Sequence, residues 1–421
     1  MCKLTSFLPR WAMVFGVSTV VLSCAPKEVA EPKPECTSFA DCASEEKPFC
    51  EPETQKCAPR PVAYQLGWDD GDPSSVDFEL VYNAPGRRVV RGFDFRPDTD
   101  ELWLTEGQAQ YGAVPCNKLN ASAETCEPKG GDFVVVYRAT TTYDRSDRIR
   151  DGNALHFARN PSSLVFSENE FFGTCPESRT ANFDDEIEDF AGPTLWSADR
   201  SILGVDIGKN GSHMDMLHFT PYCMGLEHEK DNIYWAFNGQ KGSIDRYDFK
   251  EDHGPGEEDH SDGEILRYIE GALAREEEVT SQMAMDRDND YLYIADTGNS
   301  RIIRLDIRSG ARGGVMLPNY DFVRVHHEMN GGEYEEIELG GEPMGKPSGL
   351  LLHEGLLYVI DHTYSEFRVF TTEGDPVRTL YTDFRPESLG SLVLGPDDRV
   401  YFNVPHRGEI YRINHNPHDA P

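Results

Sequence analysis

Apolar and polar residues alternate with a period of two in six stretches of the chain between residues 62 and 414. This period is that of β-strands, whose successive side chains point to opposite faces of a sheet. Each stretch follows one plan, in which an apolar strand, a turn, a strand of aromatic and aliphatic residues, a second turn and a third strand succeed one another. Four copies span Met224–Phe249, Met283–Ile307, Ser348–Phe370 and Gly390–Ile413, and more degenerate copies begin at Arg91 and Thr194.

Both faces of the central predicted strands are apolar. In the clearest copy, Tyr291 and Tyr293 fall on one face, and Leu292 and Ile294 fall on the other. A strand of this kind is buried on both sides, as it is between stacked sheets. Recurrence of one plan at intervals of some tens of residues indicates a repeat architecture. We therefore predict an all-β fold, a six-bladed β-propeller over residues 62–414.

A ring of blades has to be closed, because a free sheet edge invites pairing with other chains. The last copy shows only three strands, and the apolar segment Phe78–Tyr82 precedes the first copy. We predict that this segment supplies the fourth strand of the last blade. The longer polar segments between copies are expected to be loops that build up the faces of the propeller. They are 108–132, 140–155, 176–193, 250–280 and 308–346.

One copy carries a recognisable motif. The residues YLYIADTGNSRIIRLD, 291–306, resemble an NHL repeat. The resemblance implies that Asp296 and Asn299 fix a tight turn through side-chain hydrogen bonds to the backbone. It also implies that Gly298 takes a positive φ and that Arg301 pairs near the turn of an adjacent blade. The copy at Ser348–Phe370 keeps the Asp and the Arg of this motif but replaces the Gly-Asn between them.

The amino-terminus has the features of an export signal. Lys3 and Arg10 precede an apolar stretch, Trp11–Leu22, that is too short to span a bilayer stably. The residues that follow, Val21-Leu22-Ser23-Cys24, resemble the lipobox of bacterial lipoproteins. That resemblance implies a signal peptide over residues 1–23, a lipid on Cys24 and a location in the cell envelope, with Ala25 favouring the outer membrane. The alternative is an ordinary cleaved signal followed by an incidental cysteine.

The segment after Cys24 is predicted to be a flexible tether over residues 24–35, because it is rich in Pro, Ala, Glu and Lys. A compact group of four cysteines then defines a module over residues 36–57. With so little core, disulfides are expected among Cys36, Cys42, Cys50 and Cys57, in any of three connectivities. Zinc is less favoured, because the C-x2-C spacing of metal knuckles is absent. The module resembles small Cys-rich modules of secreted myxobacterial proteins.

Four further cysteines lie in the predicted propeller. Cys116 and Cys126 flank a polar loop and are expected to pair with each other. Cys175 and Cys223 are then left, and a bridge between neighbouring blades is the arrangement that they suggest.

Charge narrows the possible partners. The chain of 421 residues has a net charge of −34, so its surface repels nucleic acid and anionic lipid. Contact with a membrane is therefore expected through the lipid anchor alone.

Histidines cluster around the third predicted blade. We consider a metal site formed by His218, His253, His260 and Asp262, which suits zinc or calcium, while Met214 and Met216 beside His218 suggest copper. The alternative is a solvated acidic loop with methionines in the core. Propeller enzymes such as peptidylglycine lyases and lactonases hold a metal in the central channel. The innermost strands here could present His218, Met283, Ser348 and His156, which gives no set of three equivalent histidines.

Known catalytic signatures are missing from the sequence, including G-x-S-x-G, H-E-x-x-H and a phosphate-binding loop. The leading hypothesis is therefore a binding or scaffold protein of the cell envelope, with a protein or a glycan as partner. The alternative is a metal-dependent hydrolase or lyase that uses the propeller channel. Zinc, calcium and copper stay open as cofactors.

Overall fold

The computed structural model describes residues 61–415 except 68–70, 72, 74–75, 87, 109–113, 116–125, 128–130, 182–189 and 206–209, together with residues 35, 42, 47, 49–51 and 55–59. The chain forms two compact units, Met1–Arg60 and Pro61–Pro421. In the first unit, β1 (Phe49–Glu51) and β2 (Lys56–Ala58) form an antiparallel hairpin. A disulfide joins Cys42 to Cys57 there. Within the described residues, no helix is long and apolar enough to cross a bilayer.

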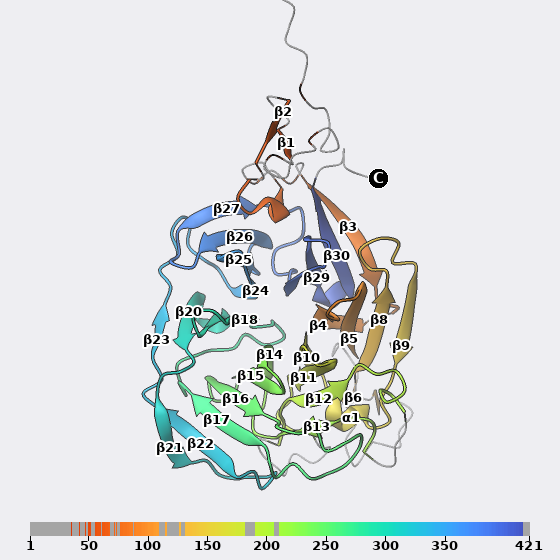
Figure 1. The fold of residues 1–421 in the computed structure, drawn as a ribbon, viewed down its shortest axis with the longest axis vertical. Coiled ribbons are helices and arrows are strands. Elements are labelled where there is room, and N and C mark those ends of the chain that lie inside the picture. Colours follow the sequence, from red (N-terminus) through yellow and green to blue (C-terminus); the bar gives the residue numbers. More distant parts are fainter. Residues whose placement is uncertain are drawn as a thin grey trace, which may run out of the picture. The chain divides into compact units, whose positions relative to one another are not determined.

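The second unit is an all-β, six-bladed β-propeller, as the repeats predict (Figure 1). Blade 1 contains β4 (Arg88–Phe95), β5 (Glu101–Gln108), β8 (Asp132–Tyr137) and β9 (Arg145–Ile149). Blade 2 contains β10 (Pro161–Phe166), β11 (Phe171–Pro176), β12 (Thr194–Ser197) and β13 (Asp215–Met216). Blade 3 contains β14 (Cys223–Lys230), β15 (Ile233–Asn238), β16 (Ser243–Asp248) and β17 (Glu264–Tyr268).

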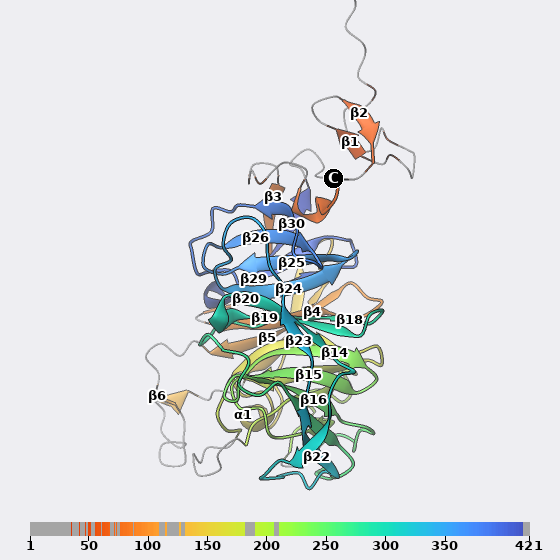
Figure 2. The same ribbon diagram turned by 90° about the vertical axis from the view of Figure 1, so that its left-hand side faces the viewer.

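Blade 4 contains β18 (Met283–Asp286), β19 (Tyr291–Asp296), β20 (Arg301–Asp306) and β23 (Tyr334–Glu336). Blade 5 contains β24 (Pro347–His353), β25 (Leu356–Asp361), β26 (Glu366–Thr371) and β27 (Pro376–Leu380). Blade 6 contains β28 (Leu392–Leu394), β29 (Val400–Val404), β30 (Glu409–His415) and β3 (Val76–Asn83). Short elements outside the blades are α1 (Ala154–Phe157), β6 (Val114–Pro115) and β7 (Cys126–Glu127). Seen edge-on in Figure 2, β6 stands clear of the blades.

The predicted closure of the ring is confirmed. β3 pairs antiparallel with β30, and the register runs from Val76 opposite His415 to Asn83 opposite Glu409. Glu79 of β3 accepts hydrogen bonds from Arg412 and Asn414 of β30. The two ends of the propeller sequence therefore share one sheet, which removes the free edge that blade 6 would otherwise present.

Burial on both faces of the central strands is also confirmed. Leu292 and Ile294 of β19 pack with Trp235 of blade 3, while Tyr293 on the opposite face packs with Leu350 of blade 5. Each blade thus lies between two neighbours, and its middle strands form the core that holds the ring together.

The outer strands differ from the prediction. β9, β17 and β23 lie in segments that we expected to be loops. Exposure explains why β9 and β23 show no apolar alternation, since all three residues of β23 are exposed. In blade 2, the copy that begins at Thr194 covers only the third strand. The first two strands, β10 and β11, lack the repeat pattern by which we identified the other blades.

Blade 3 is larger than the repeat predicts. Part of the long segment 308–346 forms β21 (Ala311–Val315) and β22 (Val325–Asn330), and β22 pairs in parallel with β17. The sheet therefore has six strands in the order β14-β15-β16-β17-β22-β21.

A disulfide between Cys175 of β11 and Cys223 of β14 joins blades 2 and 3. It is the bridge between neighbouring blades that the cysteine count suggested. The other cysteine predictions, for Cys24, Cys36, Cys116 and the side chains of Cys50 and Cys126, lie outside the described residues.

The NHL-like turn connects two blades, and one of its predicted details is wrong. Asp296 accepts hydrogen bonds from the backbone N–H of Ala274, in the segment that follows blade 3, and from the side chains of Asn299 and Arg301. Arg301 also donates to the carbonyl of Ala272. The residue with positive φ is Ser300, at 56°, and not Gly298.

The glycine at position 298 is explained by space. A Cβ there would lie 2.7 Å from the carbonyl oxygen of Ala274, and the N–H of Gly298 donates to that same oxygen. The glycine therefore permits a close approach of two blades.

Candidate functional site

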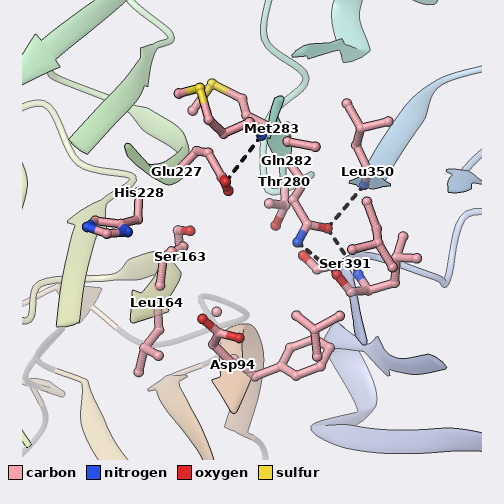
Figure 3. A pocket seen from close by; sticks show the side chains of 18 of the residues that line it. Asp94, Ser163, Leu164, Glu227, His228, Thr280, Gln282, Met283, Leu350 and Ser391 are labelled. Atoms are coloured by element: carbon pink, nitrogen blue, oxygen red, sulfur yellow. Dashed lines mark hydrogen bonds between the residues drawn. The ribbon is translucent and has the colours of Figure 1, made fainter. Parts of the chain in front are cut away.

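The innermost strands of all six blades surround a cavity of about 290 Å³ in the channel of the propeller (Figure 3). Its wall comes from β4, β10, β14, β18, β24 and β28, which follow one another around the ring. The volume is at the lower end of the range for small-molecule pockets. Every blade therefore contributes residues to its wall.

Two carboxyl groups, of Asp94 on β4 and Glu227 on β14, point into this cavity (Figure 3). Burial raises the pKa of Asp94 to about 7, although the backbone N–H groups of Phe166 and Phe95 donate to its oxygens. Burial raises the pKa of Glu227 to about 8, against the opposing charge of Arg287 and a hydrogen bond from the N–H of Met285, while the charge of Asp94 adds to the rise.

These raised pKa values have a common cause. Each carboxyl sits deep among protein atoms, where its charged form is poorly solvated. Each carboxyl accepts one hydrogen bond from the backbone of the next blade, from Phe166 for Asp94 and from Met285 for Glu227, so each group also links two blades. Near neutral pH a large fraction of both groups is protonated, and a protonated carboxyl can donate as well as accept a hydrogen bond. Perturbed pairs of this kind are typical of functional sites.

Further polar groups complete the lining. The side chain of Gln282 is held in place, because its Oε1 accepts from the N–H groups of Leu350 and Leu392 and its Nε2 donates to the carbonyl of Leu392. Ser163 and Ser391 add hydroxyls, and Thr280 has a buried Oγ1 without a hydrogen-bond partner among the described residues. The remaining wall combines apolar side chains, mainly leucines, methionines and phenylalanines, with the polar side chains of Arg91, His228 and Arg287.

Glycines let the inner strands approach one another near the channel. A Cβ at Gly92 would lie 2.3 Å from the carbonyl carbon of Ser163 in the next blade, and one at Gly225 would lie 2.0 Å from the carbonyl oxygen of Ser281. Asp94 and Glu227 each follow such a glycine by two residues, in strands whose pairing shifts register around the glycine. The narrow contact at the glycine thus positions the carboxyl that comes next.

Of the four residues that we considered for the channel, only some lie on innermost strands. Met283 lines the cavity, whereas Ser348 of β24 is buried and donates to the carbonyl of Gly390. His156 lies in α1, and His218 follows β13, so neither is on an innermost strand. The histidine that does line the channel is His228, which sequence reasoning did not select.

The predicted metal residues are only partly brought together. His253 and His260 join His213 in one group at the outer edges of blades 2 and 3. The side chain of His218 instead pairs with Asp321, with 2.7 Å between Nδ1 and Oδ1, and stacks on Phe190. Among the described residues, the structure gives no ligand group that contains His218 or Asp262.

Sequence reasoning also missed Asp94 and Glu227. A signal for them exists, because each is an acidic residue inside a strand whose neighbours on both sides are apolar or aromatic, in RGFDF and MGLEH. Isolated carboxyls at such positions are rarely left without a role, since they cost free energy to bury.

Comparison with known proteins gives no family. No family model matches the chain, and no curated protein matches it. Solved structures that resemble it include a nutrient-binding protein described as auxiliary, from Bacteroides ovatus, with 11% identity, 80% of this chain and 76% of that chain covered, and a TM-score of 0.47.

A streptogramin B lyase structure has 11% identity, covers 81% of this chain and 98% of its own, and has a TM-score of 0.43. A calcium-binding protein from Agrobacterium tumefaciens, regucalcin, has 12% identity, with 82% of this chain and 94% of that chain covered and a TM-score of 0.46. At such identities the likeness concerns architecture, so function has to be argued from the site.

Proposed function

We propose that this protein is a binding protein of the cell envelope whose propeller channel holds a small, neutral, hydroxyl-rich ligand, such as one sugar unit of a glycan. The observation that carries the proposal is the pair of carboxyls, Asp94 and Glu227, in a channel cavity of about 290 Å³. Their pKa values of about 7 and 8 leave both groups able to donate hydrogen bonds near neutral pH.

The two protonated carboxyls favour a neutral ligand over a cation. A sugar hydroxyl both donates and accepts, as a protonated carboxyl and a serine hydroxyl do. The side chains of Asp94, Glu227 and Ser163 offer such groups from three blades, and the leucines and methionines between them cover the carbon skeleton. Binding a cation here would first require both carboxyls to lose a proton.

Display of this site at a membrane surface is part of the same proposal. It rests on the lipobox-like residues around Cys24, the tether over residues 24–35 and the Cys-rich module over residues 36–57. Labelling with radioactive palmitate tests it: the intact chain should take up label, and Cys24→Ser should abolish it. Equal labelling of the Cys24→Ser chain would contradict the lipid anchor without affecting the channel.

Binding is tested by calorimetry and by saturation-transfer NMR with a panel of free monosaccharides, including N-acetylglucosamine, glucose, galactose and mannose. Glu227→Gln keeps the shape of the side chain but fixes its hydrogen-bonding pattern, so affinity should fall about 10-fold or more, equivalent to about 1.4 kcal/mol. Glu354→Gln, at an exposed position in the turn before β25, is the matched control and should bind normally.

The pH dependence gives a second readout. Affinity should decline as pH rises through 7 to 8, because ionised carboxyls no longer donate. The proposal is wrong if no sugar of the panel binds, or if binding is indifferent to Asp94→Asn and Glu227→Gln.

The alternative, a hydrolase or lyase, is favoured by the same two groups. Carboxyls with pKa values near neutrality suit general acid–base catalysis. A metal in the channel has less support, since none of His213, His253 and His260 lines the cavity. Turnover of a lactone or a peptidyl substrate that disappears in Glu227→Gln would replace the binding proposal by this one.

A further inference from the structure

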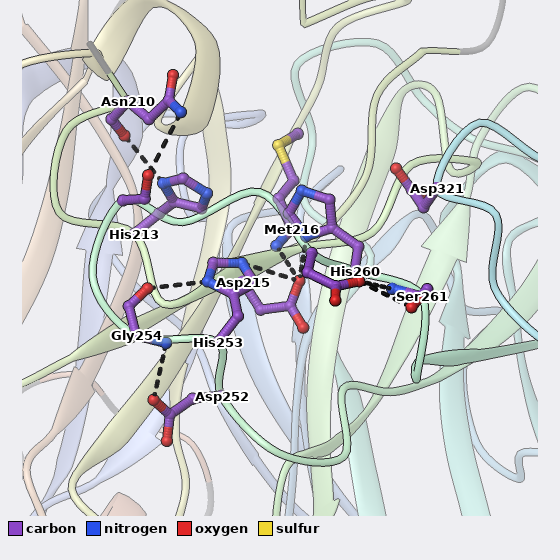
Figure 4. A network of polar contacts seen from close by, with 12 residues as sticks. Asn210, His213, Asp215, Met216, Asp252, His253, Gly254, His260, Ser261 and Asp321 are labelled. Atoms are coloured by element: carbon purple, nitrogen blue, oxygen red, sulfur yellow. Dashed lines mark hydrogen bonds and ion pairs between the residues drawn. The ribbon is translucent and has the colours of Figure 1, made fainter. Parts of the chain in front are cut away.

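Three histidines from two blades meet at the outer edge of the propeller. His213 comes shortly before β13, the outermost strand of blade 2, and His253 and His260 lie in the segment that joins β16 to β17 in blade 3. One ring nitrogen from each lies within 4.8 Å of the other two. Figure 4 shows the three rings gathered beside Asp215. This cluster lies outside the channel and takes no part in the binding function proposed above.

The hydrogen bonds of the three rings fix which nitrogen is available. Nδ1 of His213 lies 2.9 Å from the carbonyl oxygen of Asn210, and Nδ1 of His253 lies 2.8 Å from that of Gly254. Nδ1 of His260 lies 2.7 Å from Oδ1 of Asp215. Carbonyl and carboxylate oxygens accept hydrogen bonds, so each Nδ1 carries the hydrogen. In the neutral rings, each Nε2 therefore presents a lone pair.

These Nε2 atoms make few contacts with other polar groups of the chain. Within the described part of the chain, Nε2 of His213 is buried without a hydrogen-bond partner. Nε2 of His253 is also buried and outside hydrogen-bond geometry, and it lies 3.5 Å from Oδ1 of Asp215, which is an ion-pair contact when the ring is protonated. His213 is 1% exposed, and the side chains of His253 and His260 are 6% and 15% exposed. Leaving buried polar atoms unpaired destabilises the folded chain. A shared partner placed between the rings removes that destabilisation.

The surroundings hold the rings in position. Phe157 of α1 stacks on His213, with ring centroids 3.6 Å apart and planes 14° from parallel. Asp215 is completely buried, and its Oδ1 lies 2.7 Å from Nδ1 of His260 and 3.5 Å from Nε2 of His253. A carboxylate that accepts from the far nitrogen of a histidine is the usual support of a metal-binding imidazole.

The three imidazole nitrogens favour zinc over calcium and magnesium. Calcium and magnesium prefer oxygen ligands, whereas three imidazoles suit zinc, which binds nitrogen at about 2.0–2.1 Å in tetrahedral sites. Nitrogens around tetrahedral zinc lie roughly 3.3 Å apart, so atoms already within 4.8 Å need only small side-chain rotations. The buried carboxylate of Asp215 stands beside the site, and the charges of Asp252 and Asp259 also act on the histidines, so these groups offset part of the charge of the ion.

We propose that His213, His253 and His260 bind a zinc ion through their Nε2 atoms, with water as the fourth ligand and Asp215 as the support of His260. The ion joins the edge of blade 2 to the β16–β17 segment of blade 3. It acts as a clamp between blades, as the disulfide of Cys175 and Cys223 does nearer the centre.

The test uses the full chain, purified without a histidine tag. After removal of metal with dipicolinate and titration with ZnSO4, mass spectrometry of the metal should give about one tightly bound zinc per chain. His260→Asn should weaken zinc binding roughly 100-fold or more, and Asp215→Asn should weaken it roughly 10- to 100-fold. His327→Asn is the matched control, since Nδ1 of His327 also contacts a carbonyl oxygen, that of Gly313, and it should bind zinc normally.

Two further measurements guard against misfolding. Cobalt in place of zinc should give the strong visible absorption of a tetrahedral site in the intact chain and not in His260→Asn, while circular dichroism shows that both are folded. Zinc should raise the melting temperature of the intact chain and leave that of His260→Asn unchanged. Absence of bound zinc at micromolar free zinc, or undiminished binding by His260→Asn, overturns the proposal.

Discussion

Arg267 and Asp245 form a bidentate ion pair inside blade 3, with Nε and one terminal nitrogen of the guanidinium 2.7 and 2.8 Å from the two carboxylate oxygens. The side chains are 3% and 0% exposed. Burial alone would raise the pKa of Asp245, but the charge and hydrogen bonds of Arg267, together with bonds from Asn238 and Thr220, lower it. Asp245 therefore stays ionised inside the blade, and the positive charge of Arg267 balances its negative charge.

Removing one partner should be severely destabilising. Arg267→Ala leaves the carboxylate of Asp245 buried and uncompensated, for which we expect a loss of about 3–5 kcal/mol in the free energy of unfolding. Urea denaturation followed by circular dichroism measures it. The control is Arg308→Ala, which removes an exposed partner of Asp290 and should cost less than about 1 kcal/mol. Similar losses in the two variants would contradict this account of the pair.

The channel carboxyls should make stability fall as pH rises. The pKa values of Asp94 and Glu227 are about 7 and 8 in the folded chain, against about 3.9 and 4.3 when unfolded. At pH values between the unfolded-state and the folded-state pKa, the folded chain binds more protons than the unfolded chain. A rise in pH therefore favours unfolding. The slope is at most about 1.4 kcal/mol per pH unit for each group.

The measurement is urea denaturation at intervals from pH 5 to pH 8.5, which spans the range set by those pKa values. Because other groups titrate too, the double variant Asp94→Asn, Glu227→Gln serves as the reference, and its stability should depend less on pH. An unchanged slope would mean that the two carboxyls are ionised at neutral pH.

In the NHL-like turn, Gly298 permits the close approach of two blades and Ser300 has the positive φ, and mutation can separate these two roles. Gly298→Ala places a Cβ against the carbonyl of Ala274 and should destabilise the propeller. Ser300→Gly relieves a left-handed residue, with φ of 56°, and should stabilise it by about 0.5–1 kcal/mol. The melting temperatures of the two variants, compared with that of the unchanged chain, test both expectations. If Ser300→Gly destabilises the chain instead, the side chain at position 300 matters more than its backbone conformation.

The disulfide between blades should contribute measurably to stability. The Cys175→Ser, Cys223→Ser double variant opens a loop of 48 residues and should lose roughly 2–4 kcal/mol. Urea denaturation monitored by tryptophan fluorescence reports on the propeller. The matched control is Cys42→Ser, Cys57→Ser in the first unit, which should leave the propeller transition in place. Equal shifts in both double variants would show that the effect does not arise from the bridge between blades.

The sequence predicted the parts of this fold that are buried on both sides. The alternation around Tyr293 was enough to predict the blades. The apolar segment before the first blade was enough to predict how the ring closes. Strand β23 escaped prediction because its three exposed residues carry no alternation. The predicted explanation for Gly298, a positive φ, was wrong, because a sequence shows a glycine but not the neighbouring chain that approaches it.

The site was less predictable for a related reason. Asp94 and Glu227 belong to different blades, and only closure of the ring brings them to one cavity. For the histidines, the sequence grouped Met214 and Met216 with His218, and His213 was not among the predicted ligands. In the structure, the strand in this segment is limited to Asp215–Met216; a turn and a bend precede it, and irregular chain follows it. His213 consequently faces the loop of the next blade.

Closure by β3 has a consequence for the order of events during synthesis. β3 leaves the ribosome early, but its partner β30 follows more than 300 residues later. At about 5–20 residues per second the delay is of the order of tens of seconds. Throughout that time blade 6 does not exist and the ring is open at both sides. A chain that stops short of β30 can therefore complete inner blades but never a closed propeller.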